Sequence, residues 1–203
     1  MIDKSRLLNV AQGGYLAMRN LNHLPQCYDA LAELGVKYIR LDWLLYDAFY
    51  RVARLDEKGQ LVTDFSRLDR VILPLLQRGI EPQMCVMGNP GFLSPGPVGG
   101  DNGMPTNLKR YGQVVRAMVA HYVALGHRGW YWEVGNEPDN FATYKDDQYM
   151  DIYRVVAEAV RSADPSARIG GMGVSNFRPG SREGIPWRLL DRKSTRLNSS
   201  HSS

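Results

Sequence analysis

Hydrophobic residues along the chain follow two alternating spacings, one typical of helices and one typical of strands. The helical spacing, with apolar residues three or four positions apart, predicts helices over residues 23–34, 65–77, 107–125 and 146–163. Short apolar runs between them predict strands over residues 7–10, 36–41, 80–87, 130–134 and 167–171. Strands and helices therefore alternate from the first strand to the fifth, with no internal sequence repeat.

Such alternation favours a parallel sheet whose strands are joined by helices, which defines an α/β fold. A barrel and a doubly wound open sheet both fit the pattern, and both place functional residues after the C-terminal ends of the strands. No Gly-x-Gly-x-x-Gly follows the first predicted strand, which argues against a dinucleotide site. The Gly- and Pro-rich residues 89–105 predict a long loop of the kind that is often functional.

Composition and charge narrow the range of partners. The chain has 203 residues, of which 44% are hydrophobic and 23% charged, enough for one core and one domain. The net charge of +4 is modest and no basic cluster alternates with aromatic residues, so we expect no nucleic-acid partner. No apolar run reaches the ~18 residues of a membrane span, so we expect no membrane association. The polar first residues do not resemble a signal peptide, which favours the cytoplasm if Met1 is the true start.

Metal and cofactor chemistry find little support in the sequence. The four histidines share no ligand spacing with one another. The two cysteines, Cys27 and Cys85, show no metal spacing, and Cys85 lies in an apolar run, which predicts a buried thiol. We therefore expect no cofactor, no metal and no disulfide framework.

Residues 191–203 differ in character from the rest of the chain. They read DRKSTRLNSSHSS and contain a single large apolar residue, Leu197. A disordered polar terminus fits this composition, but the string DRKSTRLNSSH also resembles one translated frame of a common sequencing adapter. We therefore predict that residues 191–203 are artefactual and that the natural sequence is readable only through residue 190.

The clearest candidate chemistry lies in the stretch YWEVGNEPDNF, where an apolar strand ends in Gly-Asn-Glu-Pro-Asp. We expect Pro138 to restrict Glu137 to an extended conformation and thereby to aim its carboxylate. Asn136 offers a donor and an acceptor to a hydroxyl-rich ligand. Trp130 and Trp132 would surround the carboxyl with aromatic surface that favours its protonated form. These properties suit a general acid acting on a glycosidic oxygen, although on spacing alone a plain turn fits equally well.

Several stretches resemble a known family of enzymes. WEVGNEPD is similar to the fourth-strand signature of the retaining glycoside hydrolases of clan A, which are TIM barrels. RLDWLLYD, beginning at Arg40, resembles the second-strand segment of glycoside hydrolase family 39, the β-xylosidase and α-L-iduronidase family, whose pattern there is Arg-Phe-His-Gly-Leu-Leu-Ser-Asp. Residues 56–82 and 146–171 resemble further helices and strands of that family, so the likeness covers most of residues 24–175.

The resemblance, carried over position by position, implies roles for individual residues. Glu137 would be the general acid/base, and Asn136 would bond the sugar 2-hydroxyl. Arg40 would lie low in the site and orient the nucleophile, or would only pair with a barrel carboxylate such as Glu133. The candidate sugar contacts are Asp42, Trp43, Asn89 and Asp139. For a tryptophan in particular, plain packing is the commoner role.

Three positions depart from the family pattern. Asp42 stands where the family has a sugar-binding histidine, and Cys85 stands where it commonly has a glutamate. Gly135 replaces a bulky aromatic residue. These departures argue against a direct transfer of the family's xylosidase and iduronidase specificities.

Retaining hydrolysis needs a second carboxylate about 5–5.5 Å from the first as nucleophile. In the clan this glutamate ends the seventh strand, whereas the predicted elements reach only a fifth strand and the start of a fifth helix over residues 185–190. A complete barrel takes about 250 residues. We therefore predict that residues 1–190 are the N-terminal part of a (β/α)8 TIM barrel truncated after about strand five. Unpaired edges would make this piece poorly soluble, and it would have no turnover of its own.

Two other functions compete with the glycosidase. A non-catalytic carbohydrate-binding relative of the same barrel would use Asn136 and the tryptophans to hold an oligosaccharide or glycoside. A doubly wound α/β hydrolase or synthase unrelated to sugars is disfavoured, because no Gly-x-Ser-x-Gly elbow is present. The sequence names neither the sugar, the linkage nor the oligomeric state.

Overall fold

The computed structural model describes residues 9–12, 21–96, 103–138, 146–171 and 173. Within them, five parallel strands form one sheet in the order β1-β2-β5-β6-β7, and an antiparallel pair, β3-β4, lies outside it. Each strand of the large sheet therefore lies beside the next one in chain order. This is the order of a barrel wall, whereas a doubly wound sheet reverses its order, so that alternative is wrong.

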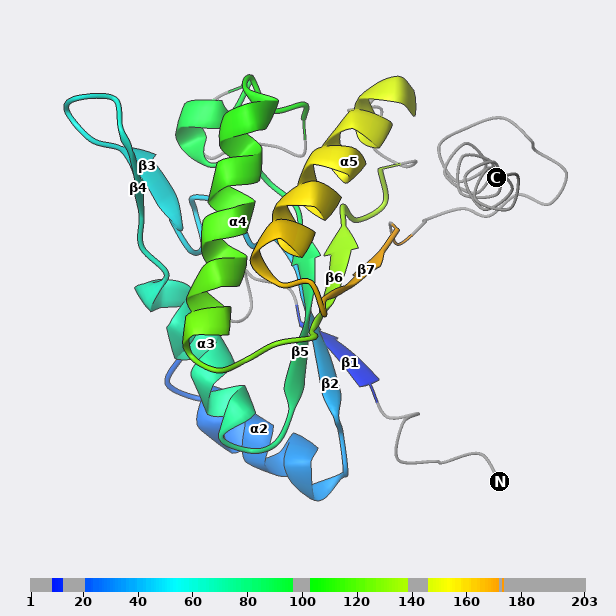
Figure 1. The fold of residues 1–203 in the computed structure, drawn as a ribbon. Coiled ribbons are helices and arrows are strands. Elements are labelled where there is room, and N and C mark those ends of the chain that lie inside the picture. The colour runs from blue at the N-terminus through cyan, green and yellow to red at the C-terminus, as the bar shows by residue number, and fades with distance from the viewer. Residues whose placement is uncertain (1–8, 13–20, 97–102, 139–145, 172, 174–203) are drawn as a thin grey trace, which may run out of the picture.

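Short strands alternate with longer helices. The strands are β1 (Asn9–Gln12), β2 (Tyr38–Leu41), β3 (Ala53–Leu55), β4 (Leu61–Thr63), β5 (Glu81–Val86), β6 (Tyr131–Val134) and β7 (Arg168–Gly170). The helices are α2 (Leu24–Glu33), α3 (Ser66–Leu76), α4 (Leu108–Ala124) and α5 (Asp146–Ala163), with a 3-10 turn, η2, at Gly91–Leu93. Figure 1 shows α4 and α5 side by side in front of the sheet, with α3 beside α4.

The two faces of the sheet differ in polarity because side chains alternate along each strand. The face that meets the helices is apolar and buried, and carries Ile39, Leu41, Met84, Val86, Trp132 and Val134. The opposite face, which would face the inside of a barrel, carries Arg40, Gln83 and Glu133. The core therefore lies between sheet and helices, and the polar chemistry lies on the inward face.

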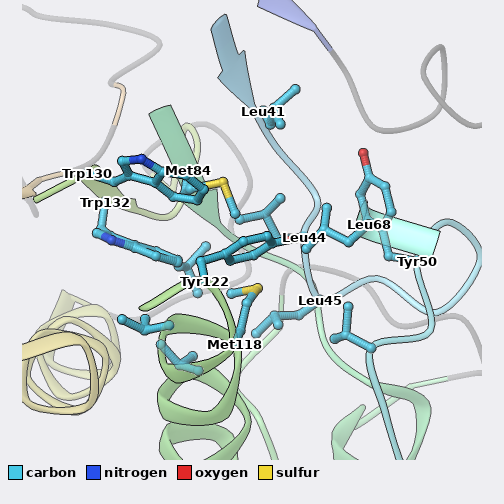
Figure 2. Packing of buried hydrophobic residues seen from close by; sticks show 14 of the residues in the cluster. Leu41, Leu44, Leu45, Tyr50, Leu68, Met84, Met118, Tyr122, Trp130 and Trp132 are labelled. Atoms are coloured by element: carbon cyan, nitrogen blue, oxygen red, sulfur yellow. The ribbon is translucent and has the colours of Figure 1, made fainter. Parts of the chain in front are cut away.

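The tryptophans of the β6 region belong to this core. Trp130 is 4% exposed and Trp132 is 2% exposed. The centroids of the Trp130 ring and of the Tyr122 ring on α4 lie 5.0 Å apart, and Figure 2 shows both residues within the buried cluster. Both side chains are too buried to stack on a sugar, so the expectation that they hold a ligand is wrong. Period-two alternation explains this, because it sends Trp132 to the helix side and Glu133 to the inward side. An aromatic surface around the Glu137 carboxyl stays a prediction.

A hairpin, β3-β4, is an element that the hydrophobic pattern does not predict. Its strands pair Ala53 with Thr63 and Leu55 with Leu61. The Asp56 carboxylate closes the turn by accepting from Lys58 N and Gln60 N at 2.9 and 2.7 Å. The turn projects from the body of the fold in Figure 1.

The bounds of the other elements lie close to the predicted ones, except at the first strand. The pattern predicts a strand over residues 7–10, of which 7 and 8 lie outside the described residues, and the parallel pairing of β1 with β2 continues past the predicted end through Gln12. Backbone hydrogen bonds to β2, not side-chain polarity, set this register. The helix start at residues 185–190 and the artefactual tail at 191–203 lie outside the described residues and stay predictions.

Candidate active site

One ion pair between β2 and β6 organises the inward face of the sheet. Arg40 on β2 donates from Nε to Glu133 Oε2 at 2.6 Å and from Nη2 to Oε1 at 2.9 Å. Gln83 on the intervening β5 donates from Nε2 to Oε2 at 3.1 Å. Glu133 is only 7% exposed, and a buried carboxylate needs such partners to offset its lost hydration. The expected pairing of Arg40 with Glu133 is thus confirmed, whereas a role of Arg40 in orienting the nucleophile stays a prediction.

Arg40 also reaches residues beyond the strand ends. Nη2 donates to Asn136 Oδ1 at 2.9 Å, and Nη1 lies 3.6 Å from Asp42 Oδ2. The hydrogen bond with Glu133 raises the pKa of Arg40, and the nearby Cys85, Glu133 and Asp42 add to this against the opposing effect of burial. The guanidinium therefore remains charged.

Cys85 is the buried thiol that the sequence predicts. Its Sγ accepts a hydrogen bond from Arg40 Nη2 at 3.2 Å. Burial raises the pKa of the Cys85 thiol well above its usual value, and the negative charge of Glu133 acts in the same direction. The thiol is accordingly a neutral neighbour of the ion pair and no nucleophile.

The backbone of Glu137 is not extended. Glu137 has φ +44°, in the left-handed region, and Gly135 has φ +74°. The conformation expected from Pro138 is therefore wrong. A following proline disfavours the right-handed helical region, and here two hydrogen bonds select the left-handed one. Gly135 N donates to the Val86 carbonyl at 2.9 Å, and Glu137 N donates to the Gly173 carbonyl at 2.6 Å.

Gly173, beyond the end of β7, connects Glu133 with Glu137. Its N–H donates to Glu133 Oε1 at 2.8 Å, while its carbonyl accepts from Glu137 N. A cavity of about 380 Å³ opens beside it on the inward face. The cavity is lined by Arg40, Gln83, Tyr131, Trp132 and Glu133 and by glycines of β7 and its C-terminal end. Charged and amide groups from β2, β5 and β6 thus converge beside this cavity.

Trp43 adopts an uncommon backbone conformation just after β2. Its φ is +57°, a region that costs a residue with a side chain about 1–2 kcal/mol. The half-buried ring packs with Tyr46 and Phe49, with 5.2 and 6.4 Å between ring centroids. A sugar contact by Trp43, like that by Asp42, stays a prediction.

Two further predicted contacts lie on loops. Asn89 is 1% exposed, and its Nδ2 donates to the Gly103 carbonyl at 2.8 Å, which holds the long loop after β5. Its amide nitrogen is thus already engaged, and its predicted sugar contact stays a prediction. Asp139 lies outside the described residues.

Sequence reasoning finds Glu133 only as a partner of Arg40 and misses Gln83 and Gly173. The sequence does carry a weak signal for Glu133 and Gln83, because each is a polar residue within a buried strand and alternates with apolar neighbours. Gly173 carries no such signal, because its contacts come from residues far away in the sequence.

In the described part of the chain, no group of three or more His, Cys, Asp or Glu side chains is placed to hold a metal ion. No helix in the same ranges combines the length and the apolar character needed to cross a membrane.

The parallel strands lie in chain order, with helices on one face of the sheet and polar residues on the other. This is the arrangement of part of a TIM-barrel wall. The sequence model described as glycosyl hydrolases family 39 matches residues 9–191. The chain therefore belongs to glycosyl hydrolase family 39, and the predicted family and barrel class are confirmed.

Individual relatives agree with this assignment. The chain is 28% identical over 172 residues to a β-xylosidase of Geobacillus stearothermophilus, a match that covers 76% of the chain and 33% of that relative. It is 26% identical over 170 residues to the α-L-iduronidase of Mus musculus, covering 79% of the chain and 25% of that relative. The chain thus spans a third or less of these curated relatives.

A solved structure shows the shared fold. The crystal structure of a monomeric β-xylosidase from Caulobacter crescentus matches with a TM-score of 0.74 at 24% identity. The match covers 96% of this chain and 40% of that one. The five described strands of the sheet therefore correspond to part of a larger barrel.

Proposed function

We propose that the complete protein containing this chain is a retaining glycoside hydrolase in which Glu137 is the general acid/base. Membership of family 39 implies a glycoside substrate. One observation carries the residue assignment. Asn136 and Glu137 follow β6 at the end of the sheet where active sites of barrels lie, and both are tied to the Arg40–Glu133 pair.

The proposed mechanism has two steps. In the first, Glu137 gives its proton to the glycosidic oxygen while a second carboxylate attacks the anomeric carbon and forms a covalent glycosyl-enzyme. In the second, the Glu137 carboxylate takes a proton from water, and the water oxygen displaces the second carboxylate. Two inversions give overall retention. Asn136 would bond the sugar 2-hydroxyl, a contact that strengthens in the transition state.

Glu133 is a poor candidate for the second carboxylate. Its Oε1 accepts from Arg40 and Gly173, and its Oε2 accepts from Arg40 and Gln83. A carboxylate engaged on both oxygens is a weak nucleophile. We propose instead that the nucleophile ends the seventh strand of the barrel, beyond residue 190. Residues 1–190 alone would then bind at most one side of a sugar and turn over none.

The test uses the complete polypeptide, expressed from the source gene through the segment that follows residue 190. Aryl xylosides and iduronides are assayed first, because the relatives act on such sugars by name, and other aryl glycosides follow. We expect Glu137→Gln to lower kcat/KM roughly 100- to 10,000-fold for aglycones that need protonation. Cleavage of 2,4-dinitrophenyl glycosides, whose aglycone departs unprotonated, should be affected far less.

Glu81→Gln is the matched control, because Glu81 is an exposed carboxylate at the opposite, N-terminal end of β5. We expect it to behave as the unmodified protein does. A Glu137→Gln variant as active as this control, or one equally impaired for both classes of aglycone, would remove Glu137 from the acid/base role. Sugar binding without any turnover would identify a non-catalytic carbohydrate-binding relative instead.

A further inference from the structure

The Glu133 carboxylate has more partners than a simple ion pair provides. It accepts hydrogen bonds from Arg40 Nε and Nη2, from Gln83 Nε2 and from Gly173 N, at distances between 2.6 and 3.1 Å. These donors come from β2, β5 and the segment after β7. Because both oxygens are held from several directions, the position and the orientation of the carboxylate are fixed, and those of Arg40 with it.

This arrangement decides which way the Asn136 amide faces. A guanidinium has only donors, so the amide atom that lies 2.9 Å from Arg40 Nη2 must be the acceptor, Oδ1. The donor nitrogen, Nδ2, is then turned away from Arg40. No described residue accepts a hydrogen bond from Nδ2. Without Arg40 in place, the amide would be equally free to present its oxygen or its nitrogen.

We propose that Glu133 is a positioning residue for recognition of the sugar 2-hydroxyl. Its carboxylate holds Arg40, and Arg40 holds the Asn136 amide so that Nδ2 donates to the 2-hydroxyl oxygen. The proposal rests on the proposed function and assigns to Glu133 a role that needs no contact with the substrate. It also explains why a buried carboxylate lies on the face of the sheet that borders the site.

A kinetic comparison separates this role from a merely structural one. Glu133→Gln keeps the shape of the side chain but places an amide NH2 against donors of Arg40 or Gly173. In the complete polypeptide, we expect kcat/KM for a 2-hydroxy aryl glycoside to fall roughly 10- to 100-fold, as for a slightly misplaced contact group. The matched 2-deoxy glycoside should react at the unmodified rate. Equal losses for the two substrates would overturn the proposal.

Two glycines offer a steric version of the same test. A Cβ at Gly173 would lie 3.1 Å from Glu133 Oε1, 3.6 Å from Asn136 Oδ1 and 3.8 Å from Arg40 Nη2. A Cβ at Gly126, which lies outside the cavity lining, would meet nothing within 4 Å. We expect Gly173→Ala to reduce the preference for the 2-hydroxy substrate and Gly126→Ala to leave it unchanged. The reverse order, or no effect of either, would count against the network.

A measurement that needs no turnover separates the positioning role of Glu133 from the proposed glycosidase function. In the 15N-labelled complete polypeptide, Asn136→Asp identifies the side-chain amide resonances of Asn136 by their disappearance. We expect Glu133→Gln to shift or broaden these resonances, because the amide loses its fixed partner. Unchanged resonances would overturn the role of Glu133, whatever the enzyme does. Shifted resonances together with an inactive complete polypeptide would speak only against the proposed function.

Discussion

Asp164 joins the end of α5 to the loop that leads into β6, and removing its carboxylate should destabilise this connection. The residue is 2% exposed. Its Oδ2 accepts from Gly129 N at 2.7 Å, and its Oδ1 accepts from Ser166 N at 3.0 Å. Burial alone would raise the pKa of Asp164, but hydrogen bonds from Ser166 and Gly129, with the charge of Arg128, hold it below its ordinary value.

The magnitude depends on which donors lose their partner. In Asp164→Ala, the exposed Ser166 N–H can donate to water in place of the lost carboxylate. The half-buried Gly129 N–H has no such replacement and is left without an acceptor. A hydrogen bond to a charged group contributes about 1.5–3 kcal/mol, so we expect the free energy of unfolding to fall by about 2 kcal/mol. Asp151→Ala, within α5, is the matched control. Its side chain is 48% exposed and bonds only Arg154 among the described residues, so we expect a change within about 0.5 kcal/mol.

The pH dependence supplies an independent check. Folding lowers the pKa of Asp164, so its stabilising contribution is present above the unfolded-state value of about 3.9 and is lost as the pH falls through the folded value. Urea unfolding, followed by the fluorescence of the buried tryptophans, should therefore show a smaller gap between the unmodified chain and Asp164→Ala at pH 3 than at pH 7. An equal gap at both pH values, or a loss no larger than in Asp151→Ala, would refute the reasoning.

Two further predictions concern a closely packed glycine, Gly88, and the two cysteine thiols. Gly88→Ala should cost about 2–4 kcal/mol, because left-handed backbone strain adds to overpacking. Gly88 has φ +80°, and its new Cβ would lie 3.0 Å from Tyr46 Cβ and 3.1 Å from Tyr46 N. Gly126→Ala, at φ +92° with open space around it, should cost only the strain, about 1 kcal/mol, and equal urea midpoints for the two variants would contradict the packing. A thiol reagent should modify exposed Cys27 in the native chain and buried Cys85 only after unfolding, so two fast thiols would count against the burial of Cys85.

The main sheet and its helices follow from apolar spacing, because each of these elements buries one face along its whole length. On the predicted apolar face of α3, Leu68, Val71, Ile72 and Leu75 are buried and Leu76 is half-buried. The β3-β4 hairpin escapes such reasoning, because three-residue strands are too short for a period-two pattern to stand out. Only the turn around Gly59, with φ +72°, offered a local signal.

The sequence predicts which residues form the site better than it predicts the hydrogen bonds between them. The sequence places Arg40 on the second predicted strand and Asn136 just after the fourth, and the structure joins them across the intervening β5 by a hydrogen bond. The backbone of Glu137 depends on Gly173, which is distant in the sequence, so the local preference set by Pro138 could not reveal it. Tertiary hydrogen bonds override local propensity here, as they commonly do where a side chain must be aimed.

The central claim is that Glu137 acts as acid/base in a two-carboxylate site, and azide trapping by a Glu137→Ala variant of the complete polypeptide tests it most directly. Azide needs no general base, and the removed side chain leaves room for it beside the glycosyl-enzyme. The account predicts that azide restores turnover of a dinitrophenyl glycoside and that NMR shows a glycosyl azide with the anomeric configuration of the substrate. No rescue, or a glycosyl azide of inverted configuration, would contradict it.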